Sequence, residues 1–130
     1  MRSKLEEKYA DMLEKQKQTG EIVSWEYEPM RITIGVNRYY TPDFRVVYPD
    51  RTEIVEAKGF PFIWNPKTKR REFAAEKEAR RRGKLAFMVA AYWVLEDVIW
   101  RLVEENKKTK EIETIYCIKD GKKLKRKDWP

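Results

Sequence analysis

The chain has 130 residues, of which 42% are hydrophobic, and this fits one folded domain rather than a disordered chain or two ordinary domains. It contains no histidine and one cysteine, which excludes histidine-based catalysis, intrachain disulfides and cysteine-rich zinc sites. The formal net charge of +7 favours a polyanionic partner, with nucleic acid as the first candidate and an anionic membrane surface as the second.

The first predicted element is a helix over residues 3–20. Ser3 and Glu6 have the spacing of a capping box, and Gly20 is a typical C-cap. Apolar residues follow at helical spacing: Leu5, Tyr9, Met12 and Leu13. The N-terminus lacks the apolar segment of a signal peptide, and the longest apolar run, over residues 85–95, is too short to span a bilayer. We therefore expect an intracellular protein without a membrane partner.

Three strands are predicted next, over residues 31–36, 38–48 and 52–59. They are rich in tyrosine, valine and isoleucine, and the first alternates apolar and polar residues. Pro49 and Asp50 lie between the second and third strands, so these two are expected to pair as an antiparallel hairpin.

The second half is predicted to contain a basic helix over residues 67–83, a buried strand over 84–93 and an amphipathic helix over 94–108. A last strand or hairpin follows, with its turn at Asp120-Gly121. The order α-β-β-β-α-β-α-β predicts one α/β domain.

This single domain is expected to cover residues 1–130 and to end in a basic tail over about residues 119–130, whose final KKLKRKDWP is expected to fray. Cys117 lies in the strand-like run TIYCIK and is interpreted as a small core residue rather than a nucleophile.

Positive charge is concentrated in two blocks of the sequence. Nine basic and three acidic side chains, a net charge of +6, occur in each of two segments, residues 67–84 and residues 107–127. By contrast, residues 1–28 contain five basic and seven acidic side chains, a net charge of −2. A single block of this kind is often only a solvated face. Two blocks on one small domain favour a surface for phosphates.

The predicted hairpin brings acidic residues together. If Pro49 and Asp50 form a two-residue turn, position n pairs with position 99 minus n, and Asp43 lies opposite Glu56 with Cβ atoms roughly 4.5–5.5 Å apart. A four-residue loop would instead place Asp43 opposite Lys58, with Glu56 on the diagonal. Either alternative puts all three groups on one face of the sheet.

Two facing carboxylates repel, and either a raised pKa on one of them or a bound divalent cation relieves this repulsion. Mg²⁺ prefers such oxygen ligands, makes a coordinated water easier to deprotonate and offsets charge on a phosphate. Lys58 would then orient the water or stabilise developing charge. The alternative is a surface hairpin in which Lys58 pairs with Glu56 or Asp43.

The segments TPDF and VEAKG resemble the motif of the PD-(D/E)XK nuclease superfamily, here Pro42-Asp43 and Glu56-Ala57-Lys58. The predicted α-β-β-β-α-β order also resembles the restriction-endonuclease-like core of that superfamily, over roughly residues 3–95. The closest likeness is to small phage-type endonucleases, including junction-resolving ones. In these a first helix often begins with S-K-x-E and ends at Gly-Glu-Ile, as SKLE and GEI do here.

The resemblance implies that Asp43 and Glu56 bind a metal ion, Mg²⁺ with Mn²⁺ as a substitute. It also implies that the carbonyl of Ala57 is a third ligand and that Lys58 is the catalytic lysine. Glu6 is a candidate fourth acid, because the family often takes a glutamate from its first helix. The alternative for Glu6 is a capping glutamate that bonds back to the Ser3 amide.

Aromatic and basic residues after the Glu-Ala-Lys segment are the candidate nucleic-acid contacts. Bases stack on exposed aromatic rings, and cationic side chains bind phosphates. The candidates are Trp64, Lys67, Lys69, Arg70 and Arg71. Tyr39 and Tyr40 are either stacking residues or, more commonly for aromatics in strands, core residues.

The sequence thus predicts a metal-dependent endonuclease that hydrolyses DNA phosphodiester bonds and selects branched DNA such as a Holliday junction. A phage-encoded enzyme of DNA recombination in a bacterial host fits this reading. Paired cuts need two active sites, so the prediction includes a homodimer, with Trp93 and Trp100 as interface or core residues. The alternatives are a related nuclease in restriction, transposition or flap processing, and a non-catalytic nucleic-acid-binding domain.

Overall fold

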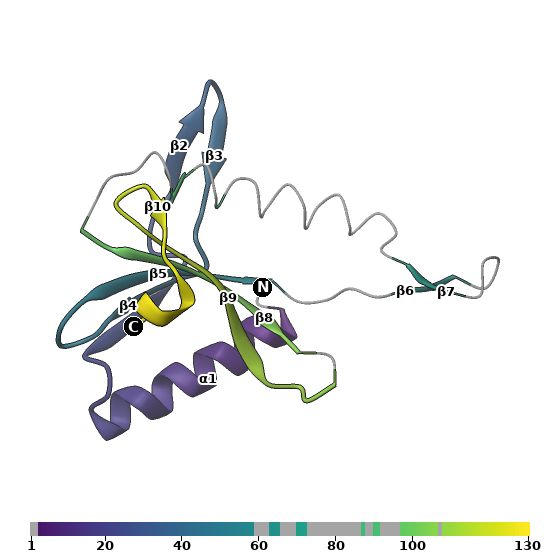
Figure 1. Cartoon of the computed structure of the whole chain (residues 1–130), viewed down its shortest axis with the longest axis horizontal. Helices are drawn as coiled ribbons and strands as arrows, with labels where there is room; N and C mark the ends of the chain where they lie inside the picture. The colour runs from purple at the N-terminus through teal and green to yellow at the C-terminus, as the bar shows by residue number, and fades with distance from the viewer. Residues whose placement is uncertain are drawn as a thin grey trace.

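The computed structural model of the chain describes residues 3–58, 63–65, 70–72, 87, 90–91, 97–106 and 108–130. These residues form a single α/β domain in which an N-terminal helix packs on a six-stranded mixed sheet (Figure 1), and two two-stranded sheets are separate from it. The predicted α/β class is confirmed at this level. No helix within the described residues is long and apolar enough to cross a membrane.

The helix α1 spans Lys4–Thr19, as predicted. It begins at a complete capping box, in which the Glu6 N–H donates to Oγ of Ser3 over 3.1 Å and the Ser3 N–H donates to the Glu6 carboxylate over 3.4 Å. It ends at Gly20, whose φ of 85° requires the left-handed conformation that glycine adopts without strain.

The main sheet contains strands from both halves of the chain, in the order β1-β4-β5-β8-β9-β10. All neighbours are antiparallel except β5 and β8, which run parallel. The strands are β1 (Ser24–Tyr27), β4 (Phe44–Val47), β5 (Thr52–Lys58), β8 (Ile99–Glu105), β9 (Ile112–Lys119) and β10 (Lys122–Lys123). Two smaller antiparallel sheets pair β2 (Ile32–Gly35) with β3 (Arg38–Tyr40) and β6 (Ile63–Asn65) with β7 (Arg70–Glu72).

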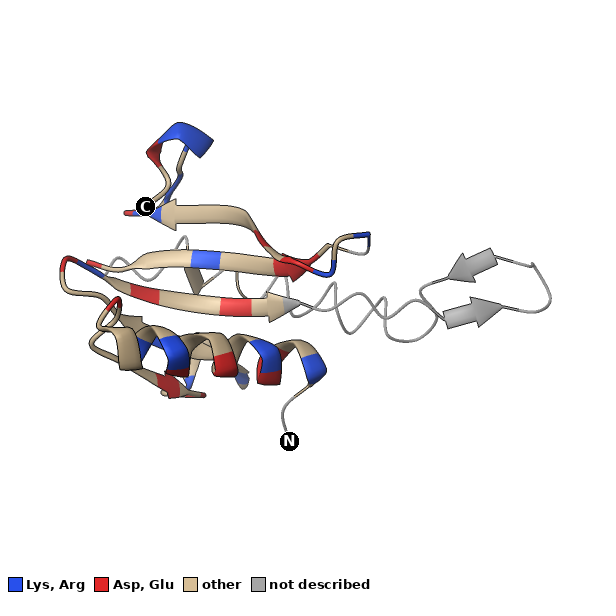
Figure 2. Ribbon diagram, turned by 90° about the horizontal axis from the view of Figure 1, so that it is seen from below, with Lys and Arg blue, Asp and Glu red and all other residues tan. Residues whose placement is uncertain are grey.

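The sheet has a different core on each face. Figure 2 shows α1 lying along one face, where Tyr9 packs on Phe44 with ring centroids 5.1 Å apart. On the opposite face, Trp100 packs on Phe87 at 6.0 Å within a second buried cluster. We call these the helix face and the far face.

Pro42 divides the strand that was predicted over residues 38–48. Proline has no N–H to donate to a sheet, so the segment splits into β3 and β4, which belong to different sheets. Strand β1 was not predicted at all, although Trp25 and Tyr27 alternate there and both pack on Phe44.

Three elements predicted after residue 66 are wrong in the residues that the structure describes. Residues 70–72 of the predicted basic helix form strand β7. Within the predicted buried strand over 84–93, Phe87, Ala90 and Ala91 are helical. The predicted helix over 94–108 contains strand β8, in which apolar residues are buried on both faces, so that its pattern is not that of an alternating strand.

The C-terminal tail is ordered, in contrast to the predicted fraying. The predicted turn is present, with Asp120 and Gly121 at φ 52° and 71° between β9 and β10. A short 3₁₀ helix, η1 (Arg126–Asp128), follows, and the Trp129 indole N–H donates to the Leu124 carbonyl over 3.3 Å. The guanidinium of Arg101 donates to the Pro130 carbonyl over 3.4 Å and so links the tail to the sheet.

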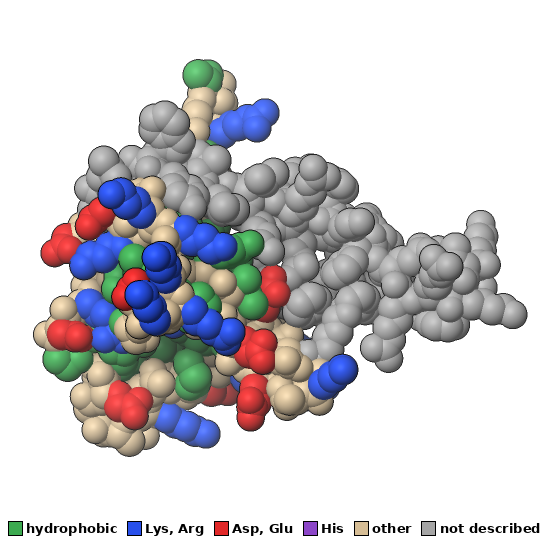
Figure 3. All heavy atoms as spheres, in the orientation of Figure 1, with side chains coloured by type: hydrophobic (Ala, Val, Ile, Leu, Met, Phe, Trp, Pro, Cys, Tyr) green, Lys and Arg blue, Asp and Glu red, His purple; other side chains and the backbone are tan. Residues whose placement is uncertain are grey.

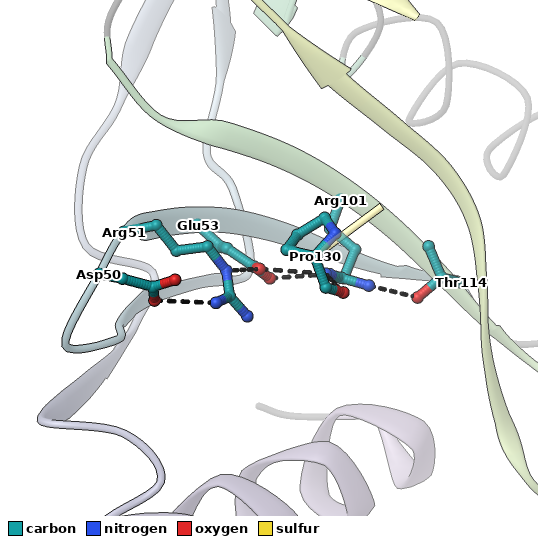
Figure 4. A network of polar contacts seen from close by, with 6 residues as sticks. All are labelled: Asp50, Arg51, Glu53, Arg101, Thr114 and Pro130. Carbon is teal, nitrogen blue, oxygen red and sulfur yellow. Dashed lines mark hydrogen bonds and ion pairs between the residues drawn. The ribbon is translucent and has the colours of Figure 1, made fainter. Parts of the chain in front are cut away.

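Arg101 also belongs to a buried charge network (Figure 4). The fully buried Glu53 carboxylate accepts hydrogen bonds from Arg101 over 2.7 and 3.0 Å and from Arg51 over 2.7 Å. Arg101 donates further to the Thr114 hydroxyl over 2.7 Å. Burial alone would lower the pKa of Arg101, but the hydrogen bonds and charge of Glu53 outweigh it and raise that pKa. The network ties β5, β8 and β9 together on the helix face.

Candidate functional site

The register of the β4–β5 hairpin decides which residues face each other. Phe44 pairs with Val55 and Val47 pairs with Thr52, and the Tyr48 N–H donates to the Arg51 carbonyl over 2.7 Å across the turn. Each of these pairs sums to 99, so the two-residue turn at Pro49-Asp50 is confirmed and the four-residue loop is wrong. The ladder ends at the Phe44–Val55 pair, Asp43 lies just beyond it, and the cross-strand pairing of Asp43 with Glu56 stays a prediction.

Alternation along β5 places the Glu56 carboxylate on the far face of the sheet. Val55 and Ala57 belong to the core under α1, whereas Ile54 belongs to the core on the opposite side. Glu56, two residues after Ile54, shares its face. The carboxylate is only 3% exposed, so the protein holds a buried acid at this position.

Asp43 is held by backbone groups on both sides. Its Oδ2 accepts a hydrogen bond from the Ala57 N–H over 2.8 Å, and its own carbonyl accepts one from the Glu28 N–H over 2.8 Å. Asp43 is 9% exposed and follows the fully buried Pro42. A backbone N–H that donates to a carboxylate fixes its orientation.

Tyr40 orients the second acid. Its buried hydroxyl, at the end of β3, donates to Oε2 of Glu56 over 2.5 Å. Burial, the negative charge and hydrogen bond of Glu56, and the charge of Asp43 raise the pKa of Tyr40 far above its usual range. Tyr40 therefore remains a donor at neutral pH. Of the two alternatives for the tyrosine pair, Tyr40 is a core residue with a polar contact, while Tyr39 is exposed.

The two acids fit a divalent cation that takes oxygen ligands. Mg²⁺ is often bound through one or two carboxylates, with water and substrate phosphates completing its shell. Within the described residues no group of three histidine, cysteine, aspartate or glutamate side chains could hold a metal ion. Any further ligands of the ion would have to be oxygens of other groups, such as backbone carbonyls, substrate phosphates or water. The carbonyl of Ala57, the residue after Glu56, stays a predicted ligand.

Glu6 belongs to the opposite side of the sheet from this pair. Its carboxylate accepts hydrogen bonds from the Ser3 N–H and, over 2.7 Å, from the Tyr27 hydroxyl. Burial and then the hydrogen bond and charge of Glu6 raise the pKa of Tyr27. The capping alternative is confirmed, and the structure does not bring Glu6 into a three-acid group with Asp43 and Glu56.

The remaining predicted residues are placed only in part. Lys58 is the last residue of β5, and its side chain is not among the described parts of the chain. Trp64 in β6 pairs with Arg71 in β7, and Asn65 pairs with Arg70. The side chains of Trp64, Arg70 and Arg71, and the whole of Lys67 and Lys69, lie outside the described residues. Their contacts with nucleic acid stay predictions.

Glu104 is a buried acid that the sequence analysis missed. It lies beside Lys58 in the parallel β5–β8 register and is 8% exposed. The neighbouring Glu105 forms an ion pair with Lys8 of α1, with the two charged atoms 3.1 Å apart, and therefore lies on the helix face. Because side chains alternate along a strand, Glu104 lies on the far face, as Glu56 does. Interpreting this segment as a helix concealed the acid, because a helix gives Glu104 no place beside Lys58 at the end of β5.

Comparisons of the chain with protein-family models, with curated proteins and with solved structures found no significant match.

Proposed function

We propose that this protein is a Mg²⁺-dependent endonuclease that hydrolyses DNA phosphodiester bonds. One observation carries the proposal: two buried carboxylates, Asp43 and Glu56, come directly after the last pair of the β4–β5 ladder, and burial, together with the charges of both, raises the pKa of the Tyr40 hydroxyl. Each of them is oriented by a protein donor, the Ala57 N–H for Asp43 and the Tyr40 hydroxyl for Glu56. Buried acids held in a fixed orientation are costly for a fold and are typical of sites for cations.

In this proposal the residues of the chain have separate roles. Asp43, Glu56 and the Ala57 carbonyl hold the ion, and Lys58, at the end of β5, presents its ammonium to the attacking water or to the phosphate. When bound, Mg²⁺ supplies a lowered pKa for water and offsets charge on the phosphate. Tyr40 keeps the Glu56 carboxylate in position, and no covalent intermediate with the chain is needed.

The order of the described elements supports the resemblance to the PD-(D/E)XK nucleases. Helix α1 is followed by three antiparallel strands of the main sheet, β1, β4 and β5, then by helical residues at 87 and 90–91, and then by β8 parallel to β5. This order resembles α-β-β-β-α-β if residues 87 and 90–91 belong to the second helix, with the β2–β3 hairpin inserted after the first strand and the β6–β7 hairpin after the third. Asp43 comes directly before β4 and Glu56 lies in β5, and we propose that they take the places of the two acids of the family motif.

The substrate and assembly are finer parts of the proposal. The net charge of +7 favours DNA as the partner, and we propose selectivity for branched DNA by a homodimer. Trp100 offers no surface to such a dimer, because it is 2% exposed in the far-face core, and Trp93 lies outside the described residues. Light scattering at micromolar concentration tests the dimer, and competition between a four-way junction and a linear duplex tests the selectivity.

A cleavage assay tests the central activity. Labelled linear duplex, single strand, four-way junction and RNA are incubated with the chain in Mg²⁺ and, in parallel, in EDTA. The proposal predicts cleavage of DNA that requires the metal and is fastest on the junction. Binding of the labelled substrates without cleavage in any metal would instead favour the non-catalytic nucleic-acid-binding alternative, and cleavage that persists in EDTA would contradict the metal mechanism.

A further inference from the structure

The β2–β3 hairpin projects from the domain next to the candidate site. Figure 1 shows it standing away from the main sheet, and Figure 3 shows hydrophobic and basic side chains at its tip beyond the body of the molecule. Its base is tied to the site, because Tyr40 ends β3 and donates its hydroxyl to Glu56. Ile32 and Ile34 of β2 pack against the far-face core, so the hairpin rises on the same side as the two acids.

The projecting part of the hairpin carries positive charge and no negative charge. Residues 29–42 contain Arg31 and Arg38 but no aspartate or glutamate. Both arginines are exposed, and neither makes an ion pair within the described part of the chain. The guanidinium of Arg31 lies 4.1 Å from the centroid of the Tyr39 ring and makes a cation–π contact with it.

Apolar side chains are exposed at the same place. Val36 at the turn is 91% exposed and Tyr39 is 49% exposed, and these are two of the three large hydrophobic side chains that are exposed among the described residues. A valine at the tip of a projecting hairpin gains nothing from the fold of the free chain. Together with Arg31 and Arg38, which make no ion pair with another described residue, it is typical of a surface that meets a partner with both charge and apolar edges.

The dimensions fit a nucleic-acid groove. From Tyr40 the strand rises about 3.3 Å per residue, which puts the turn at Val36-Asn37 about 10–13 Å along the strand from Tyr40. The major groove of duplex DNA is about 12 Å wide and admits a two-stranded β ribbon. A duplex with a phosphate at Asp43 and Glu56 would therefore have a groove within reach of the turn.

We infer that the β2–β3 hairpin enters a groove of duplex DNA beside the phosphodiester held at Asp43 and Glu56. Arg31 and Arg38 bind backbone phosphates on its flanks, and Val36 contacts base edges. This inference rests on the proposed nuclease function and names the part of the chain that positions the duplex.

Salt-dependent binding tests the arginine contacts. Binding of a labelled duplex of about 20 base pairs is measured by fluorescence anisotropy in EDTA, from about 50 to about 300 mM salt, for the wild-type chain and the Arg31→Ala/Arg38→Ala variant. Each lost phosphate contact lowers the magnitude of the log–log salt slope by about 0.9, so the double variant is expected to lose about 1.8. The matched control is Lys15→Ala/Lys17→Ala, which removes two exposed charges from α1 and is expected to retain the slope.

A second pair of variants tests the apolar contact. Val36→Ser is expected to weaken duplex binding several-fold without changing the salt slope, because serine carries no charge. Val23→Ser is the control, since Val23 is also exposed, at 58%, but lies outside the hairpin. Unchanged melting temperatures show that the variants are folded. If the double alanine variant does not fold, Arg31→Gln/Arg38→Gln replaces it, because glutamine keeps more of the aliphatic part of each arginine side chain.

The outcomes separate this inference from the proposed function. If the wild-type chain cleaves DNA and the arginine variants bind with its salt slope, the inference is overturned and the nuclease proposal stands. If the wild-type chain neither binds nor cleaves DNA, both are overturned. A slope lowered in the arginine variants but not in the lysine control supports the groove contact.

Discussion

Asp43 and Glu56 do not act alone, because each carboxylate has an oriented donor. The Tyr40 hydroxyl reaches Glu56 across the short Thr41-Pro42 connection, and both partners are buried. Such supporting hydrogen bonds orient metal-binding groups and typically change metal affinity or activity by about 10- to 100-fold. Tyr40 is therefore a positioning residue for the site.

Replacing Tyr40 by phenylalanine is expected to lower cleavage about 10- to 100-fold and to raise the Mg²⁺ concentration needed for half-maximal cleavage. The free energy of unfolding should fall by about 1–3 kcal/mol, because a buried acceptor loses its donor. Titration of cleavage rate against Mg²⁺ separates these effects, since a purely structural loss would not move the metal dependence. Tyr39→Phe, at the exposed neighbour, is the control and should leave both quantities unchanged.

The family resemblance made Glu6 a candidate fourth acid of the site, whereas the structure shows it as a helix-capping residue. Its carboxylate caps α1 and accepts the Tyr27 hydroxyl on the helix face. Glu6→Ala is expected to reduce the free energy of unfolding by about 1 kcal/mol, as loss of helix capping does, and to leave the rate of cleavage within about twofold of wild type. Denaturant unfolding and a cleavage time course measure the two effects. A loss of cleavage of more than about a hundredfold with stability unchanged would restore Glu6 to the catalytic group.

At the scale of elements, the β4–β5 hairpin was predicted from the sequence. Two runs of strand-forming residues flank Pro49-Asp50, and both features indicate a hairpin. The sequence left the turn open between two and four residues and so offered two registers, of which the structure has the one with the two-residue turn. β8 was not predicted, because Ile99, Trp100, Leu102 and Val103 suit either an amphipathic helix or a strand buried on both faces. This error hid Glu104. The hydrogen bond of Tyr40 depends on a contact between two sheets, which no periodicity encodes.

The network at Glu53 is the element-scale feature most open to test. Glu53→Gln keeps the shape of the side chain but leaves Arg101, which is 12% exposed, without its charge partner. Breaking a buried pair from one side costs about 3–5 kcal/mol, so denaturant unfolding should show a loss of this size. Glu26→Gln removes the half-exposed ion pair with Arg45 on β4 and should change the free energy of unfolding by less than about 1 kcal/mol. Equal effects of the two changes would contradict a stabilising role for the buried network.

At the scale of the whole molecule, buried tyrosines predict how stability depends on pH. Burial, followed by nearby acidic and phenolic groups, raises the pKa of Tyr9, and burial with Glu56 raises the pKa of Tyr40. The unfolded chain releases these protons near pH 10, whereas the folded chain keeps them. The contribution of these two tyrosines to the free energy of unfolding is therefore complete below about pH 10. It is lost as the pH rises towards their pKa values in the folded chain.

The free energy of unfolding is accordingly expected to be insensitive to these tyrosines between about pH 7 and pH 9. Above about pH 10 it should fall by about 1.4 kcal/mol per pH unit for each tyrosine that stays protonated in the folded chain. Tyr40→Phe should make this slope shallower by about that amount, while the exposed Tyr39→Phe should not change it. Denaturant unfolding at a series of alkaline pH values provides the comparison, and identical slopes for the two variants would contradict the assignment.

The whole-molecule account depends on a metal-dependent function of the Asp43–Glu56 pair, and one matched comparison tests it most directly. Asp43→Asn and Asp50→Asn make the same change on the same hairpin, but Asp43 is 9% exposed at the site, whereas the Asp50 side chain is 74% exposed at the turn. DNA cleavage in Mg²⁺ is measured for both variants and the wild-type chain, with melting temperatures as a check on folding. The account predicts wild-type cleavage for Asp50→Asn and a loss of about a thousandfold or more for a folded Asp43→Asn. Wild-type cleavage by Asp43→Asn would contradict it.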